Sequence, residues 1–218
     1  MIRACGLALI LCAGAAHAAP LGLITSAWVA DNGQDEALVW GPEVAWKGES
    51  PLVLRARYAE GRFNTQGETE LLQEFRASAG WSMGLFEAGA GFAQLAYDTE
   101  LQPGWEPSYP TELDERTADI FGPVVFIRGE GSILIPHLEW TASLSWLPHD
   151  FGDFDDLGYD GSFLDAHAGF RLVMDERLTV GAGYRVISFR DLPDRILNDE
   201  TFDRETLDGF VADIAFEF

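Results

Sequence analysis

The chain has 218 residues, of which 47% are hydrophobic and 12% aromatic, and its formal net charge is −22 at pH 7. This apolar content excludes an intrinsically disordered chain. The negative charge argues against partners bound by bulk electrostatics, namely nucleic acids and anionic lipid surfaces.

The first eighteen residues, 1–18, predict a secretory signal peptide. Arg3 gives a positive start, residues 6–16 form a short apolar run, and Ala16-His17-Ala18 is an A-x-A cleavage site. The run is too short for a spanning helix, which needs about 20 apolar residues. Both cysteines of the chain lie inside this leader, so disulfides are not expected to stabilise the exported domain.

After the leader, residues 19–218 predict one all-β domain. They contain 13 basic and 36 acidic residues, because the leader removes only Arg3 from the charged set. Apolar and polar residues alternate in ten segments, which we predict to be strands: 21–30, 37–47, 51–62, 70–83, 85–98, 117–128, 133–147, 163–174, 178–190 and 207–218. Most are long enough to cross a bilayer when tilted, since about 9 to 11 residues suffice.

Short and long connections alternate strictly between these segments. The tight turns are predicted at 47–50, 83–86, 129–132 and 174–177. The longest connections are predicted at 99–116, 148–162 and 191–206, and they are polar and acidic. This asymmetry is typical of transmembrane barrels with short periplasmic turns and longer extracellular loops. It predicts an antiparallel up-and-down barrel of about ten strands, with eight as the alternative.

The strand faces agree with a barrel in lipid. In 70–83, for example, Phe75 and Trp81 alternate with Glu74 and Arg76. A membrane barrel turns its apolar face outward, whereas a soluble barrel turns it inward. Aromatic residues are also expected to form two girdles, the outer one including Trp28 and the inner one including Phe126. Prolines within predicted strands are expected at bulges or strand ends.

The last hairpin carries a resemblance to a known group. The sequences AGYRV (182–186) and LDGFVADIAFEF (207–218) look like the closing strands of the small porin-like outer-membrane β-barrels of Gram-negative bacteria. The resemblance implies outer-membrane localisation after export, with membrane lipid and lipopolysaccharide as surroundings. It also implies that the barrel-assembly machinery reads the last strand through Phe210, Ile214, Phe216 and Phe218. It implies no cofactor.

The polar faces carry charges of both signs, which are predicted to point into the lumen. These are Glu43, Arg55, Arg57, Glu74, Arg76, Glu139, Asp165, Arg171, Arg185, Asp213 and Glu217. A ten-stranded barrel is little wider than the eight-stranded size that side chains fill, so opposite charges should pair. We expect a salt-bridged polar plug and a structural role, with a narrow porin-like path as the alternative.

An enzyme and a soluble periplasmic barrel for an apolar ligand are the other hypotheses. Asp165 and His167 share a strand face, which loosely resembles the Asp–His arrangement of outer-membrane omptin proteases. This hypothesis requires both residues to meet loop carboxylates at an open extracellular cleft. A lumen histidine near a carboxylate is the favoured interpretation.

One acidic loop offers oxygen ligands for calcium. Asp150, Asp153, Asp155 and Asp156 lie close together in it, but the segment departs from the EF-hand pattern because Leu164 stands where a bidentate acid is needed. We expect a solvated loop and no metal site.

Overall fold

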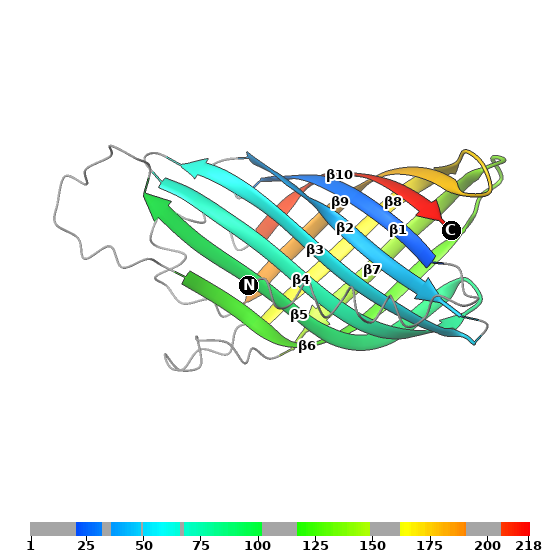
Figure 1. The fold of residues 1–218 in the computed structure, drawn as a ribbon, viewed down its shortest axis with the longest axis horizontal. Helices are drawn as coiled ribbons and strands as arrows, with labels where there is room; N and C mark the ends of the chain where they lie inside the picture. Colours follow the sequence, from blue (N-terminus) through cyan, green and yellow to red (C-terminus); the bar gives the residue numbers. More distant parts are fainter. Residues whose placement is uncertain are drawn as a thin grey trace.

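The chain closes into a ten-stranded antiparallel β-barrel. The computed structural model describes residues 21–31, 36–48, 50–65, 68–101, 117–148, 162–190 and 206–218. The strands are β1 (Leu21–Asp31), β2 (Glu36–Lys47), β3 (Leu52–Thr65), β4 (Glu68–Met83), β5 (Phe86–Leu101), β6 (Thr117–Ser132), β7 (Leu138–Leu147), β8 (Ser162–Val173), β9 (Leu178–Arg190) and β10 (Thr206–Glu217). Each strand pairs with its neighbours in sequence, and β1 (blue) pairs with β10 (red) to close the sheet (Figure 1). The predicted fold class and the ten-strand count are confirmed.

The two ends of the barrel differ in their connections. Four short connections (β2–β3, β4–β5, β6–β7 and β8–β9) lie at one end, which we call the turn end. At the opposite end, which we call the loop end, strands join through residues 32–35, 66–67, 102–116, 149–161 and 191–205. These residues, like the predicted leader, lie outside the described part of the chain.

One predicted turn is displaced. The sequence suggested a turn at 129–132 and a strand from 133, but β6 continues to Ser132 and the turn occupies 133–137. Within this turn His137 has a positive φ of 63°. The glycines that resembled a turn instead lie beneath a ring: a Cβ on Gly129 or Gly131 would come within 3.0 Å of Trp140. They are strand glycines that an aromatic side chain covers.

Bulges or strand ends were expected at Pro42, Pro123 and Pro136; Pro136 lies in the turn before β7, whereas the other two lie inside strands. Pro42 pairs with Thr25 of β1, and the β2–β3 ladder is interrupted beside it, between Trp40 and Glu43. Pro123 pairs with Phe92 of β5 and lies beyond the part of β6 that pairs with β7. Each proline therefore occupies a position where one neighbouring ladder is already open, so its missing donor is tolerated.

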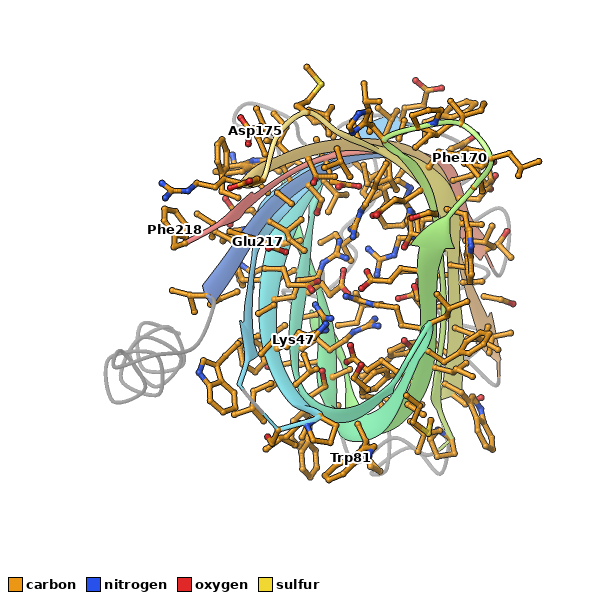
Figure 2. All side chains as sticks on the ribbon, turned by 90° about the vertical axis from the view of Figure 1, so that its right-hand side faces the viewer. Lys47, Trp81, Phe170, Asp175, Glu217 and Phe218 are labelled. Atoms are coloured by element: carbon orange, nitrogen blue, oxygen red, sulfur yellow. The ribbon has the colours of Figure 1, made fainter. Side chains whose placement is uncertain are left out.

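The barrel exterior is covered by apolar side chains. Trp40, Trp81, Phe92 and Phe170 each expose about half of their surface. Figure 2 shows Trp81 and Phe170 pointing away from the barrel. In the part of the chain described above, no helix combines the length and hydropathy needed to cross a bilayer.

The interior is divided between two kinds of side chain. Towards the loop end it holds a hydrophobic cluster, which we call the apolar zone: Trp28, Ala30, Ala37, Val39, Ala59, Phe63, Leu72, Ala93, Leu95, Ile120, Val124, Leu147, Phe163, Ile187, Leu207 and Val211. Towards the turn end the interior is charged. The girdle prediction is therefore wrong for Trp28, which is 1% exposed in the apolar zone, and for Phe126, which lines the interior.

Candidate functional site

The charged half of the interior begins at the next inward-facing position towards the turn end after the apolar zone. Because side chains alternate in direction along a strand, inward positions recur every two residues. Leu72 is followed inward by Glu74, and Phe163 by Asp165. On β9 the order runs Ile187 then Arg185 towards the turn end. The strands thus change from apolar to charged at a common depth.

We call the charged side chains of this half the ionic network. Its cations are Arg55, Arg57, Arg76, Arg128, Arg171 and Arg185. Its carboxylates are Glu43, Glu74, Glu87, Asp165 and Asp213, all of which are buried. The view from the turn end shows nitrogen- and oxygen-bearing side chains filling the space within the ring of strands (Figure 2).

Arg185 is the centre of the network. Its guanidinium donates to both oxygens of Glu74 at 2.8 and 2.9 Å and to both oxygens of Asp165 at 2.9 Å. Its guanidinium carbon also lies 4.8 Å from the ring centroid of Trp28, in cation–π contact with the apolar zone. This bidentate geometry is the kind that compensates a buried charge for its lost hydration.

Two further arginines complete this central cluster. Arg76 donates to Asp165 Oδ2 at 2.8 Å and lies 3.0 Å from Glu74 Oε1. Arg57 is more loosely held, since its nearest carboxylate oxygen belongs to Glu74 and is 3.8 Å away. Three cations thus surround two carboxylates.

A second cluster lies nearer the turn end. Arg55 donates to both oxygens of Glu87, at 3.2 and 2.8 Å, and to Glu43 at 3.2 Å. Arg128 donates to the same oxygen of Glu43 at 3.3 Å. These contacts join β2, β3, β5 and β6 across the interior, so the cluster braces strands that are not neighbours in the sheet.

A small cavity remains between the two clusters. Its volume is about 90 Å³, and its walls include all six arginines of the ionic network. Several buried polar atoms in this region have no hydrogen-bond partner among the described residues: Arg57 Nε, Arg76 Nε, Arg171 Nε, His167 Nε2 and Asp213 Oδ2. Arg171 Nε and Asp213 Oδ2 are 3.3 Å apart but lack hydrogen-bond geometry. The cavity is therefore polar, and several of its polar lining atoms have no hydrogen-bond partner among the described residues.

The structure brings nine of the eleven predicted lumen charges together. Glu139 and Glu217 are not part of the network: Glu139 is half-buried near the start of β7, and Glu217 is exposed at the turn end (Figure 2). The sequence-based choice missed Glu87 and Arg128. Small residues on both faces of β5 obscured its alternation, and Arg128 shares its face with the apolar Val124 and Phe126.

The structure places Asp165 and His167 on the wall of the interior cavity. Both oxygens of Asp165 accept hydrogen bonds from arginines, and this residue lies below Phe163 of the apolar zone. His167 lines the cavity and pairs in register with Ser143 and Arg185. The geometry required by the protease hypothesis, in which these residues face the loop end, is absent from the described residues.

The remaining predicted residues lie elsewhere. Phe210, Ile214, Phe216 and Phe218 are all exposed on or directly after β10. The weak calcium candidates Asp150, Asp153, Asp155 and Asp156 lie outside the described residues. Among those that are described, no group of three His, Cys, Asp or Glu residues is arranged to hold a metal ion.

Comparisons with known proteins find similarity to solved structures but not to a family model or a curated protein. The outer membrane protease OmpT from Escherichia coli is 8% identical with a TM-score of 0.48, over 92% of this chain and 95% of that chain. The translocator domain of the autotransporter NalP from Neisseria meningitidis is 9% identical with a TM-score of 0.46, over 100% and 95%. An anion-selective porin from Comamonas acidovorans is 11% identical with a TM-score of 0.37, and this chain, matched over 89% of its length, spans 59% of that porin. No role is transferred from these proteins to this chain.

Proposed function

We propose that this chain is an integral outer-membrane β-barrel protein with a structural role and a sealed interior. The observation that carries the proposal is the inversion of the barrel: apolar side chains cover its outside, while charged residues such as Arg185 and Glu74 are buried within it. An exterior of this kind is stable when lipid is the solvent. Closure of the sheet pairs every strand edge, as the hydrocarbon region requires.

The same inversion argues against a soluble barrel that binds an apolar ligand. Such a protein would have a polar exterior, whereas the exterior here exposes large aromatic side chains, including Trp40, Trp81 and Phe170. Export through the predicted leader, with the short turns towards the periplasm and the acidic loops outside, gives the proposed orientation.

Sealing distinguishes the proposal from the porin-like alternative. Trp28, Phe63, Leu72 and Leu147 are at most 1% exposed and come from four different strands. A packed apolar layer offers no hydrated route for ions, since interiors of this kind contain few voids larger than a water molecule. Towards the turn end, paired charges surround the small cavity described above.

Cell fractionation tests the membrane part of the proposal. The folded protein should appear in the outer-membrane fraction and migrate differently on gels before and after heating. Recovery in a soluble fraction without detergent would refute it.

Planar-bilayer recording tests the seal. The wild-type barrel should give no conductance steps, whereas a Phe63→Ala/Leu72→Ala variant that still shows heat-modifiable migration should conduct. Stable steps from the wild type would overturn the sealed interior in favour of a narrow pore.

We also propose that β10 serves as the signal for the barrel-assembly machinery. Phe218 is 74% exposed, so its removal costs little packing within the barrel. Phe218→Ala should therefore lower the amount of protein in the outer membrane without changing its stability after refolding in vitro. Phe170→Ala, at another exposed exterior position, is the matched control, and equal membrane levels for both variants would contradict the role.

A further inference from the structure

The walls of the interior cavity carry more positive than negative charge. All six arginines of the ionic network line it, but only three of its carboxylates do: Glu43, Asp165 and Asp213. Glu74 and Glu87 bind arginines without contributing to the cavity wall. The cavity is thus a positively charged space in a protein whose overall charge is strongly negative.

The same walls present donors that the protein does not use. Among the described residues, the buried Nε atoms of Arg57, Arg76 and Arg171 have no hydrogen-bond partner, although Arg171 Nε lies 3.3 Å from Asp213 Oδ2. Thr141 and Ser143 line the same cavity. Asp213 Oδ2 is the one unpartnered carboxylate oxygen among the described buried atoms. Buried donors without partners are costly, and guanidinium groups match the geometry of phosphate and carboxylate oxygens.

We propose that this cavity is a binding site for a small tetrahedral oxyanion of the phosphate or sulfate type. A volume of about 90 Å³ exceeds the roughly 10–15 Å³ that a single water site needs. The apolar zone closes the barrel towards the loop end, so the anion enters from the turn end, from which the polar interior is visible in Figure 2. The site depends on the interior geometry alone and does not require the proposed structural role.

Arg57 is the best residue with which to test the site. Within the described part of the chain its only ion pair is the 3.8 Å contact with Glu74, and Glu74 keeps Arg76 and Arg185 when Arg57 is replaced. Arg57→Gln therefore removes a cavity donor without leaving a buried carboxylate unpaired. Arg62→Gln makes the same change at an exposed position of the same strand that does not line the cavity.

The experiment is calorimetric titration of the full chain, folded in neutral detergent micelles, with phosphate, sulfate and chloride at constant ionic strength. Saturable binding of phosphate or sulfate, with at least about tenfold weaker affinity for Arg57→Gln and unchanged affinity for Arg62→Gln, is the expected result. Absence of saturable binding, or an equal response to chloride, would overturn the proposal.

A second variant keeps the test decisive if Arg57→Gln does not fold. Ser143 lies on the cavity wall, so Ser143→Asp places a carboxylate where the anion is proposed to bind. This variant should lose phosphate binding while retaining heat-modifiable migration. Wild-type affinity in a folded Ser143→Asp variant would overturn the proposal.

Discussion

The two halves of the barrel interior are filled by side chains that interact in different ways. In the loop half, Trp28, Phe63 and Leu72 fill the space by packing. In the turn half, Arg185 and its carboxylate partners fill it by charge pairing. The strands that line both halves are continuous, so the difference comes from which residues occupy the inward positions at each depth.

The two halves differ in how strictly the positions of their side chains must be matched. Apolar burial is non-directional, so the apolar zone needs matched volumes and no particular partners. A buried charge is stable only when partners and hydrogen bonds surround it. The ionic network meets this requirement at Arg185, whereas the Nε atoms of Arg57 and Arg171 find no hydrogen-bond partner among the residues described and border the cavity.

The largest expected effect comes from removing the central cation of the network. Arg185→Leu leaves Glu74 and Asp165 buried with fewer partners and should lower the free energy of unfolding by about 3–5 kcal/mol. Urea unfolding of the refolded barrel measures this. The exposed Arg177→Leu is the control, and a loss below about 1 kcal/mol for Arg185→Leu would show that charge pairing does not hold this half together.

Truncation in the apolar zone should have the next largest effect. Leu72 is 1% exposed, and Leu72→Ala should cost about 3 kcal/mol through lost burial and a residual cavity. Leu144→Ala removes the same atoms from the exterior of β7, where lipid can fill the space, and should cost clearly less. Equal unfolding free energies for the two variants would mean that the loop half is not tightly packed.

A glycine at the barrel seam tests how closely the strands approach in the loop half. A Cβ on Gly209 of β10 would overlap the carbonyl oxygen of Val29 in β1, so Gly209→Ala should cost about 1–3 kcal/mol. Gly22 lies on the same seam in the turn half, where a Cβ would be 3.8 Å from Ala45. Gly22→Ala should therefore be tolerated, and similar refolding yields for both variants would contradict the close approach.

The smallest effect is expected outside both halves, in the turn between β8 and β9. The backbone N–H groups of Arg177 and Leu178 each donate to Asp175 at 2.8 Å, which lowers the pKa of this carboxyl below its usual 3.8. Since the folded-state pKa is depressed, the stabilisation is present above pH 3.8 and is lost as the pH falls through the folded value.

Comparison of the wild type with Asp175→Asn from neutral to acidic pH checks this sign. The difference in unfolding midpoint should be small near neutral pH and should disappear in acid. Glu176→Gln removes the same charge from the same turn and is the matched control. A difference that grows as the pH falls would contradict the hydrogen-bonded turn.

The strands could be predicted from local alternation, whereas the choice of the outward face also needed the predicted leader, the alternation of short and long connections and the last strand. Phe75 and Trp81 on one face and Glu74 and Arg76 on the other require only that side chains alternate along β4. Turn positions follow less directly from local sequence: Gly129 and Gly131 resemble a turn, but they are strand glycines covered by Trp140 of the next strand.

The division of the interior could not be predicted in the same way. Inward alternation places Leu72 and Glu74 on one face but does not say that Phe163 and Asp165 meet them at the same depth. Arg185 binds Glu74 across 111 residues of sequence, a pairing set by strand tilt and barrel closure. The sequence by itself determined the class of barrel and most of the charges that turn inward. Only the tertiary structure decided which of these side chains meet, because depth and partners inside a barrel depend on the stagger of all ten strands together.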